Sequence, residues 1–331
     1  MENKVNKPTQ SIFANLFVLF FLAFVIFSSI NSKSIERKTF VIEKGMSLNS
    51  LTNVLYEEGI IGNKSFFKYS VVLRGLAGNI PTGTFAIEGD VSNAKLIRTI
   101  FDEGPIRIKI TLPEGLKSEK VLEKIENTLQ IQNNMLLTDS SFIEQFGIQA
   151  TSLEGYLFPD TYYFFQDMTI EEILTIMINQ FWNNFDQMLI NRANELGFTI
   201  HEVVTLASII EGEALFDSER KTISSVYHNR LRKNIKLQAD PTIQYLFQDG
   251  PKTLQTKHLT INSPYNTYMY YGLPPGPINN PGIKSIEAAL YPEDTDYLYF
   301  VAKGNGYHVF STNQSDHLKA KREYKKQKRM K

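Results

Sequence analysis

The 331-residue sequence predicts an α+β protein with one N-terminal membrane-spanning helix, a small strand-helix-helix-strand module and a larger mixed α+β domain. Three observations support this prediction. An uncharged apolar segment lies near the N-terminus, short strand and helix patterns alternate over residues 38–104, and amphipathic helical patterns dominate residues 105–331. The chain is long enough to bury two modest cores.

The apolar segment covers residues 12–30 (IFANLFVLFFLAFVIFSSI) and carries no charge. At a rise of about 1.5 Å per residue, a helix of this length spans the ~30 Å hydrocarbon layer of a membrane. A cleaved signal peptide would have a shorter apolar run, about 7–15 residues, before a small-residue cleavage site. We therefore expect an uncleaved anchor after a tail at residues 1–11. Basic residues flank both ends, so charge alone does not fix its orientation.

Composition excludes several classes of protein. The 35 basic and 35 acidic residues balance, which gives no overall field favouring nucleic acid. The chain has no cysteine, so disulfides, thiolate metal sites and a cysteine nucleophile are excluded. His201 starts a sequence resembling the H-E-x-x-H zinc motif, but Thr205 replaces the second histidine. We expect no metal, no cofactor and no nucleic-acid partner.

The module at residues 38–104 follows a short polar tether, Asn31–Glu36. Its expected elements are a strand at Thr39–Glu43, helices at Ser47–Leu55 and Ser65–Leu76, a strand at Gly83–Ile87 and a helix from Ser92 to about Gly104. This layout is similar to that of LysM-type modules, which bind amino-sugar polymers. A generic spacer domain would have the same composition, so both interpretations stay open.

The larger domain is expected to be mainly helical. Its elements are a strand at Arg107–Leu112, helices at Ser118–Leu129, Thr169–Gly197, Ile200–Ala214, Asp217–Lys233 (capped by Asp217 or Ser218), Thr242–Phe247 and Ser285–Leu290, and a hairpin of Tyr297–Ala302 with Tyr307–Ser311. Four prolines and two glycines make Pro274–Gly282 irregular. The basic tail from Lys319 is expected to be a solvated helix end rather than a polyanion site.

The helix at Ile200–Ala214 contains a carboxylate at an unusual position. Glu211 falls within its apolar face, whereas Glu213 points roughly 200° away, on the polar side near Glu202. A carboxyl on the buried face loses solvation, which raises its pKa towards the range of a general acid. The alternative is a structural ion pair, in which Arg220 or Arg230 neutralises Glu211.

Aromatic residues crowd residues 156–165 and 265–271, and such side chains can stack on sugar rings, although at least half of them must be core. Glycosidases ordinarily use two carboxylates. The partner of Glu211 would be Glu154 or Asp240, brought near by the fold, unless the enzyme works with one carboxylate.

Five segments occur in an order that strongly resembles the endolytic murein transglycosylase (YceG-like) family. They are LEGYLFPDTYYF (153–164), LASIIEGEA (206–214), SVYHNRL (225–231), LQADPTIQY (237–245) and SPYNTYMYYGLPPGPINNPG (263–282). The resemblance covers essentially the whole chain, including the single anchor and the LysM-like module, and makes residues 105–331 the catalytic domain. The family commonly has Lys-Glu after the motif glutamate, where this chain has Gly212-Glu213, so Glu213 is given only a weak supporting role.

By this resemblance Glu211 is the catalytic acid. Residues expected to bind substrate are Glu154, Tyr156, Asp160, Tyr162, Asn229, Arg230, Gln238, Asp240, Thr242, Tyr265, Asn266, Tyr268 and Pro274. The implied substrate is peptidoglycan, cut without hydrolysis at the β-1,4 bond between N-acetylmuramic acid and N-acetylglucosamine to leave a 1,6-anhydro end. An intramolecular nucleophile would make a second catalytic carboxylate unnecessary.

The resemblance also implies a location and partners. The N-terminus would be cytoplasmic, and the catalytic domain would face the periplasm or cell-wall space, where it would end glycan elongation beside penicillin-binding proteins. Two alternatives stay open: a hydrolytic muramidase that uses water, and a non-catalytic scaffold that binds peptidoglycan.

Overall fold

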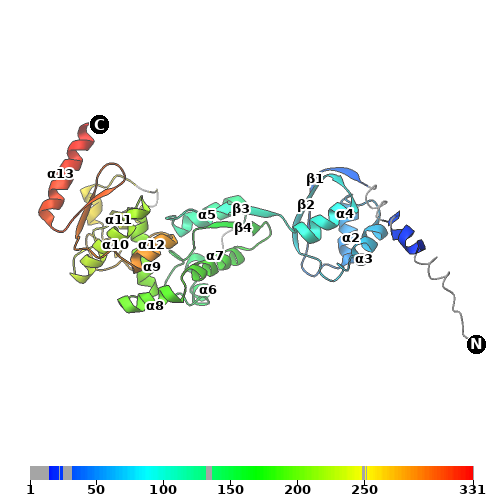
Figure 1. Ribbon diagram of the computed structural model, residues 1–331, viewed down its shortest axis with the longest axis horizontal. Coiled ribbons are helices and arrows are strands. Elements are labelled where there is room, and N and C mark those ends of the chain that lie inside the picture. The colour runs from blue at the N-terminus through cyan, green and yellow to red at the C-terminus, as the bar shows by residue number, and fades with distance from the viewer. Residues whose placement is uncertain are drawn as a thin grey trace, which may run out of the picture. The chain divides into compact units, whose positions relative to one another are not determined.

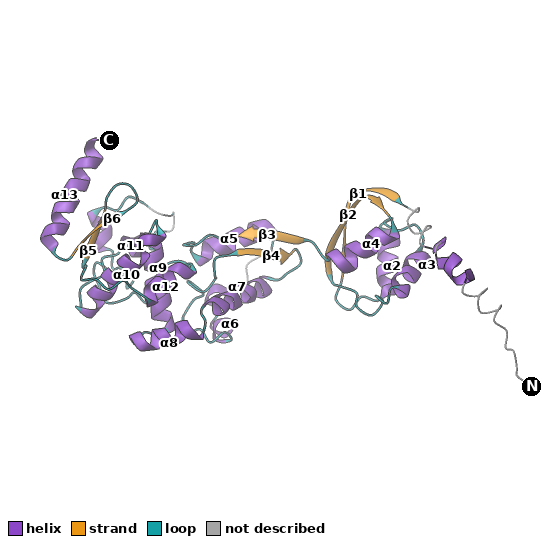
Figure 2. Ribbon diagram, in the orientation of Figure 1, coloured by secondary structure: helices purple, strands orange, loops and turns teal. Residues whose placement is uncertain are grey.

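The structure is a computed structural model that describes residues 15–21, 23–24, 32–131, 136–247, 250 and 252–330. Contacts divide the described residues into two units. The first runs to Ile108 and adds Tyr163–Met168, and the second comprises Lys109–Tyr162 and the residues from Thr169 onward. Helices dominate, and the strands of the described part form two-stranded sheets (Figure 2).

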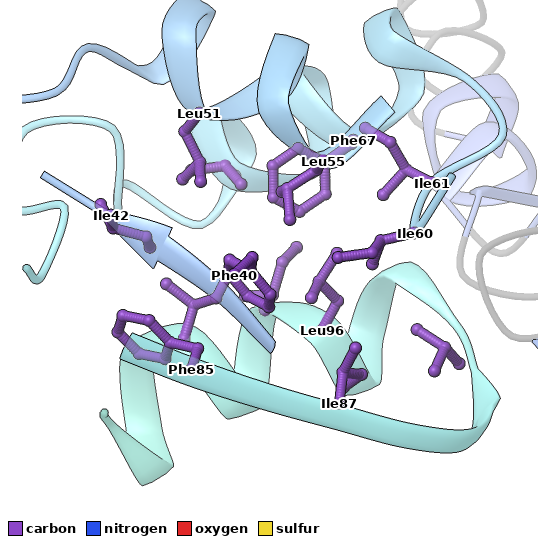
Figure 3. Packing of buried hydrophobic residues seen from close by; sticks show 14 of the residues in the cluster. Phe40, Ile42, Leu51, Leu55, Ile60, Ile61, Phe67, Phe85, Ile87 and Leu96 are labelled. Carbon is purple, nitrogen blue, oxygen red and sulfur yellow. The ribbon is translucent and has the colours of Figure 1, made fainter. Parts of the chain in front are cut away.

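The first unit is built on the antiparallel pair of β1 (Lys33–Ile42) and β2 (Gly83–Val91). Between and after these strands come α2 (Leu48–Glu57), α3 (Lys64–Leu73), α4 (Asn93–Arg98) and a π-helical turn, Thr99–Glu103. Apolar side chains from both strands and from these helices meet in one core, in which Phe40 stacks on Phe85 with ring centroids 5.6 Å apart (Figure 3).

The strand-helix-helix-strand order of this unit confirms the predicted layout, while its identification as LysM-like stays a prediction. Ser47 caps α2, as expected, by accepting a hydrogen bond from the backbone N–H of Ser50 (3.1 Å). The predicted tether is wrong from Lys33 onward, because β1 begins there and Lys33 pairs with Val91. That part of the strand is polar and mostly exposed, so it lacks the alternation that would have revealed it.

The predicted membrane span lies mostly outside the described residues. Residues 15–21 and 23–24 are helical. Among the described residues, no helix combines the length and the apolar character needed to cross a membrane. The anchor at residues 12–30 therefore stays a prediction.

The second unit contains most of the remaining elements. Its helices are α5 (Ser118–Leu129), α6 (Ser140–Glu144), α7 (Ile170–Asn184), α8 (Gln187–Leu196), α9 (Ile200–Glu213), α10 (Asp217–Arg232), α11 (Asp240–Gln244), α12 (Ile283–Leu290) and α13 (Gln314–Met330), with 3-10 turns at Leu136–Thr138 and Thr256–Thr260. Strands β3 (Arg107–Thr111) and β4 (Thr161–Phe165) pair and belong partly to each unit, and β5 (Tyr299–Ala302) pairs antiparallel with β6 (His308–Ser311).

Most helices predicted for this unit are present, and three of them differ in detail from the prediction. The single helix predicted at Thr169–Gly197 is two helices, because the chain leaves helical geometry at Phe185 and Asp186 caps α8. Helix α10 begins after Phe216 without a side-chain cap, so the predicted cap at Asp217 or Ser218 is wrong. Helix α11 begins at Asp240 and ends at Gln244, before the predicted Phe247.

Helix α9 lies at the centre of the second unit. It packs against α8, α10, α11 and α12 (Figure 1). All residues from Val203 to Ile210 are buried, whatever face of the helix they occupy. Residues 203–210 of α9 therefore have no solvated side; after them Gly212 is exposed, and Glu211 and Glu213 are partly buried against other elements.

Candidate active site

Glu211 lies in a buried ion pair. Its Oε1 is 3.1 Å from Nη1 of Arg220, and only 7% of its side chain is exposed. Its Oε2 accepts a hydrogen bond from the backbone N–H of Gly282 (3.1 Å). This is the ion-pair alternative that the sequence left open, with Arg220 as the partner. Both carboxylate oxygens are thus engaged by the protein.

A second carboxylate shares this arginine. Glu114 lies 3.9 Å from Nη2 of Arg220, and burial, together with the nearby charge of Glu211, raises the pKa of Glu114. Its side chain lies across Gly282, where an added Cβ would come within 1.8 Å of Glu114 Oε1, so a larger residue there would displace the Glu114 side chain. The contacts among Glu114, Glu211 and Arg220 therefore connect the turn at Glu114–Gly115 to the start of α12.

Glu213 lies on a different side of α9 and is half-buried. Its Oε1 accepts a hydrogen bond from the hydroxyl of Tyr227 (2.9 Å). Desolvation by burial raises the pKa of Glu213 to about 7, and the nearby charge of Asp240 adds to this effect. The prediction that Glu213 faces the polar side is therefore wrong. A helical wheel assumes one solvated face, but α10 and α11 cover this side of α9.

Glu213 lines a cleft of about 340 Å³, which we call the carboxylate lobe. Its walls are Gly115, Lys117, Gly212, Glu213, Asp240, Pro241, Gln244, Tyr245, Gly250, Ile278 and Asn279. Asp240 is held there by the hydroxyl of Tyr268, which donates to its Oδ1 (2.5 Å). The lobe is thus lined by two acidic side chains, Glu213 and Asp240, the residue types that glycosidases use. Glu211 lies beside the lobe rather than among its lining residues.

A larger cavity, of about 480 Å³, continues from the carboxylate lobe, and we call it the side lobe. The two share Gly115, Lys117 and Tyr245 among their lining residues. Glu154 lines the side lobe, and burial raises its pKa to about 7. The predicted carboxylates Glu154 and Asp240 therefore both line the cleft, in different lobes.

The irregular loop Pro274–Gly282 forms one wall of the carboxylate lobe. Asn280 holds it in place: its Oδ1 accepts from the N–H groups of Gly155 (3.1 Å) and Leu157 (2.9 Å), and its Nδ2 donates to Leu116 and Ser118. Asn279 donates to the carbonyl of Ser208 (2.9 Å), while its Oδ1 has no hydrogen-bond partner among the described residues.

Two predicted binding residues support the cleft indirectly. Tyr268 holds Asp240, as described above, and Tyr265 lies against the ring of Tyr245, with centroids 4.8 Å apart. Gln238 is exposed and in the left-handed region (φ 48°) just before α11, and Pro274 is buried at the start of the cleft-wall loop.

The other predicted binding residues make contacts within the protein. Tyr156 is buried and bonds to His201 (3.0 Å), and the hydroxyl of Tyr162 donates to the carbonyl of Phe158 (2.6 Å). Arg230 donates to the carbonyls of Leu298 and Leu237. Asn229, Thr242 and Asn266 likewise bond to nearby backbone groups, and Asp160 is exposed and accepts from Gln180. These side chains shape the second unit rather than facing the cleft.

The sequence did not single out Lys117, Tyr245 or Asn280, and it gave Glu213 only a weak supporting role. Tyr245 and Asn280 fall within segments that carry the family resemblance, which was the signal available for them. Lys117 had no signal, because an isolated lysine at the start of a helix is ordinary. Its position depends on a contact with Tyr245 across 128 residues of sequence.

Comparison with known proteins agrees with the resemblance. The model of the YceG-like family matches residues 40–323. The chain belongs to this family. A protein of Bacillus subtilis (strain 168) named endolytic murein transglycosylase is 34% identical to this YceG-like chain, over 86% of this chain and 83% of its own length.

A protein of the same name from Streptococcus pneumoniae (strain R6) is 26% identical over 87% of this YceG-like chain, which spans 58% of its length. The crystal structure of a YceG-like protein from Listeria monocytogenes matches with a TM-score of 0.61 and 31% identity, covering 86% of this chain and 98% of that one. These matches support the mixed α+β fold.

Proposed function

We propose that this YceG-like chain is an endolytic murein transglycosylase, a lyase that cuts peptidoglycan glycan strands between N-acetylmuramic acid and N-acetylglucosamine. The names of its relatives support the reaction. The structural observation that carries the proposal is Glu213, a carboxyl with a pKa of about 7 that lines a cleft. At neutral pH such a group can both hold a proton and release it.

In the proposed mechanism Glu213 gives its proton to the glycosidic oxygen, and the bond from C1 of the muramic sugar to that oxygen breaks. The N-acetylglucosamine leaves with a free 4-hydroxyl. The C6 hydroxyl of the muramic sugar then bonds to C1 and returns its proton to Glu213. Asp240 lies close enough to Glu213 to raise its pKa, and its negative charge would favour the positive charge that develops at C1.

The sequence prediction gave this proton to Glu211. That assignment has a geometric difficulty, because Glu211 faces the guanidinium of Arg220 and the N–H of Gly282 and does not line the carboxylate lobe, whereas Glu213 does. A general acid needs an oxygen within reach of the bond that it protonates. We therefore assign proton transfer to Glu213. Glu211 is assigned the role of a positioning residue that holds the walls of the cleft through Arg220 and Gly282.

The same proposal includes finer features. Residues 12–30 would anchor the chain as a single-pass membrane protein, with the amino terminus cytoplasmic and the second unit in the periplasm or cell-wall space. The LysM-like first unit would bind glycan, and cutting nascent strands beside penicillin-binding proteins would end their elongation. The long uncharged segment and the order of elements in the first unit support these features.

The reaction type is tested by digesting purified glycan strands and measuring the masses of the products by mass spectrometry. We expect wild-type protein to give fragments that end in 1,6-anhydro sugar, each lighter by one water than a hydrolysis product. Reducing ends of full mass would show a hydrolytic muramidase instead. Binding of strands without any cleavage would favour the non-catalytic scaffold.

A further inference from the structure

The side lobe contains a buried carboxyl with an unused oxygen. Only 7% of Glu154 is exposed. Its Oε1 accepts hydrogen bonds from the backbone N–H (2.9 Å) and the hydroxyl (3.2 Å) of Ser118. Within the described part of the chain, its Oε2 has no hydrogen-bond partner. Glu154 lines the side lobe, so this oxygen is available to accept a hydrogen bond from a ligand there.

A lysine faces the same lobe. Nζ of Lys117 donates to the carbonyls of Tyr245 (2.7 Å) and Phe247 (3.2 Å), which leaves one of its three N–H groups free. No carboxylate in the described ranges lies within ion-pair distance of this ammonium group. Burial lowers the pKa of Lys117, and this loss of solvation makes an added anionic partner favourable. The lobe therefore offers a donor from Lys117 and a carboxyl from Glu154.

The aromatic rings of the side lobe are poorly placed to stack on a sugar. Lys117 Nζ lies 4.9 Å from the centroid of the Tyr245 ring, and Tyr265 lies 4.8 Å from it. His258 and Lys252 contact the ring of Phe247. Stacking on a pyranose needs an open aromatic face. The lobe instead presents apolar surface together with two lysines, Lys117 and Lys120, and two glutamates, Glu119 and Glu154. Lys120 is paired with Glu123 (2.5 Å), so Lys117 is the cation left to meet a carboxylate of a short peptide with amide groups.

We propose that the side lobe binds the short acidic peptide carried by muramic acid, while the adjoining carboxylate lobe holds the bond to be cut. The inference rests on the proposed function, because it takes the glycan strand as the ligand of the carboxylate lobe. Lys117 would pair with a carboxylate of the peptide, and Glu154 would hydrogen-bond to an amide. The enzyme would then prefer strands that still bear their peptides over strands stripped of them.

The test measures binding, so it does not depend on cleavage. The full-length Glu213→Gln protein is titrated with uncrosslinked, peptide-bearing strands and with the same strands after an amidase has removed the peptides. We expect a Kd about tenfold lower for the peptide-bearing strands, the size of one good charge-assisted contact. Adding Lys117→Met should bring the ratio of the two Kd values close to one.

Two further variants separate recognition from folding. Glu154→Gln keeps an acceptor for Ser118, and we expect it also to lower the ratio. Lys221→Met, at an exposed lysine of α10, should leave the ratio unchanged. Equal Kd values for the peptide-bearing and the stripped strands in the Glu213→Gln protein would overturn the inference. It would also be overturned if Lys117→Met weakened the binding of both kinds of strand equally, because the lobe would then hold a sugar. A wild-type digest without anhydro ends would refute the proposed function instead, and the Kd ratio would still decide the inference.

Discussion

Three glutamates of the second unit illustrate how surroundings decide the role of a carboxyl. Glu211 meets Arg220, Glu213 meets a tyrosine hydroxyl and a second acid, and Glu154 meets Ser118. The sequence correctly predicted that α9 buries a glutamate at position 211. The sequence could not show that Glu213, at the end of α9, is also packed against other elements, because those elements are α10 and α11, which come later in the chain.

The raised pKa values of Glu213 and Glu154 predict how stability depends on pH. Both pKa values rise from 4.5 to about 7 on folding, so the folded state binds protons more tightly than the unfolded state. Their contribution is greatest below about pH 4.5 and is lost as the pH rises through 7. Between pH 5 and 8 the unfolding free energy of the wild type should fall. In Glu213→Gln, which has no ionisable group at this position, we expect that fall to be smaller by on the order of 1–3 kcal/mol. Urea denaturation at several pH values measures this, and an unchanged pH profile would contradict it.

At the scale of elements, the cleft depends on an irregular loop. The prolines and glycines of Pro274–Gly282 predicted its irregular structure, and the structure confirms it. The sequence could not predict which distant segments hold it, since Asn280 bonds to backbone groups more than 120 residues away. Helix capping by Ser47 and Thr169 was predictable, because those contacts are local.

Asn280→Ala tests the role of this loop. The change removes four hydrogen bonds and leaves the buried N–H groups of Gly155 and Leu157 without their acceptor. We expect a loss of about 2–4 kcal/mol in unfolding free energy and weaker strand binding, because the cleft wall is released. Thermal denaturation and strand titration measure the two effects. Asn194→Ala, at an exposed site of α8, is the matched control. Equal stability of the two variants would refute this role for Asn280.

At the scale of the whole molecule, the sequence predicted a mixed α+β fold, and the first unit has the predicted order of elements. It did not predict that residues 163–168 return to the first unit. That return depends on the pairing of β4 with β3, and a short aromatic strand does not reveal its partner.

The proposed anchor predicts membrane association. We expect the full-length chain to sediment with membranes and to resist extraction by alkaline carbonate, because the nineteen uncharged, mostly apolar residues 12–30 match the hydrocarbon thickness. A chain that begins at residue 32 should be released to the soluble fraction and should still cut glycan strands. Release of the full-length chain by carbonate would contradict the anchor.

The central claim, that Glu213 carries the reacting proton, is tested most directly by comparing the rates at which wild-type, Glu213→Gln and Glu211→Gln proteins form anhydro ends at several pH values. We predict that Glu213→Gln loses about 10²–10⁴-fold in rate with its strand affinity kept, and that wild-type activity falls as the pH rises above 7. Glu211→Gln should lose less rate and more stability, because it breaks the contact with Arg220. Near-normal cleavage by Glu213→Gln, with none by a stably folded Glu211→Gln, would contradict the account and return the proton to Glu211.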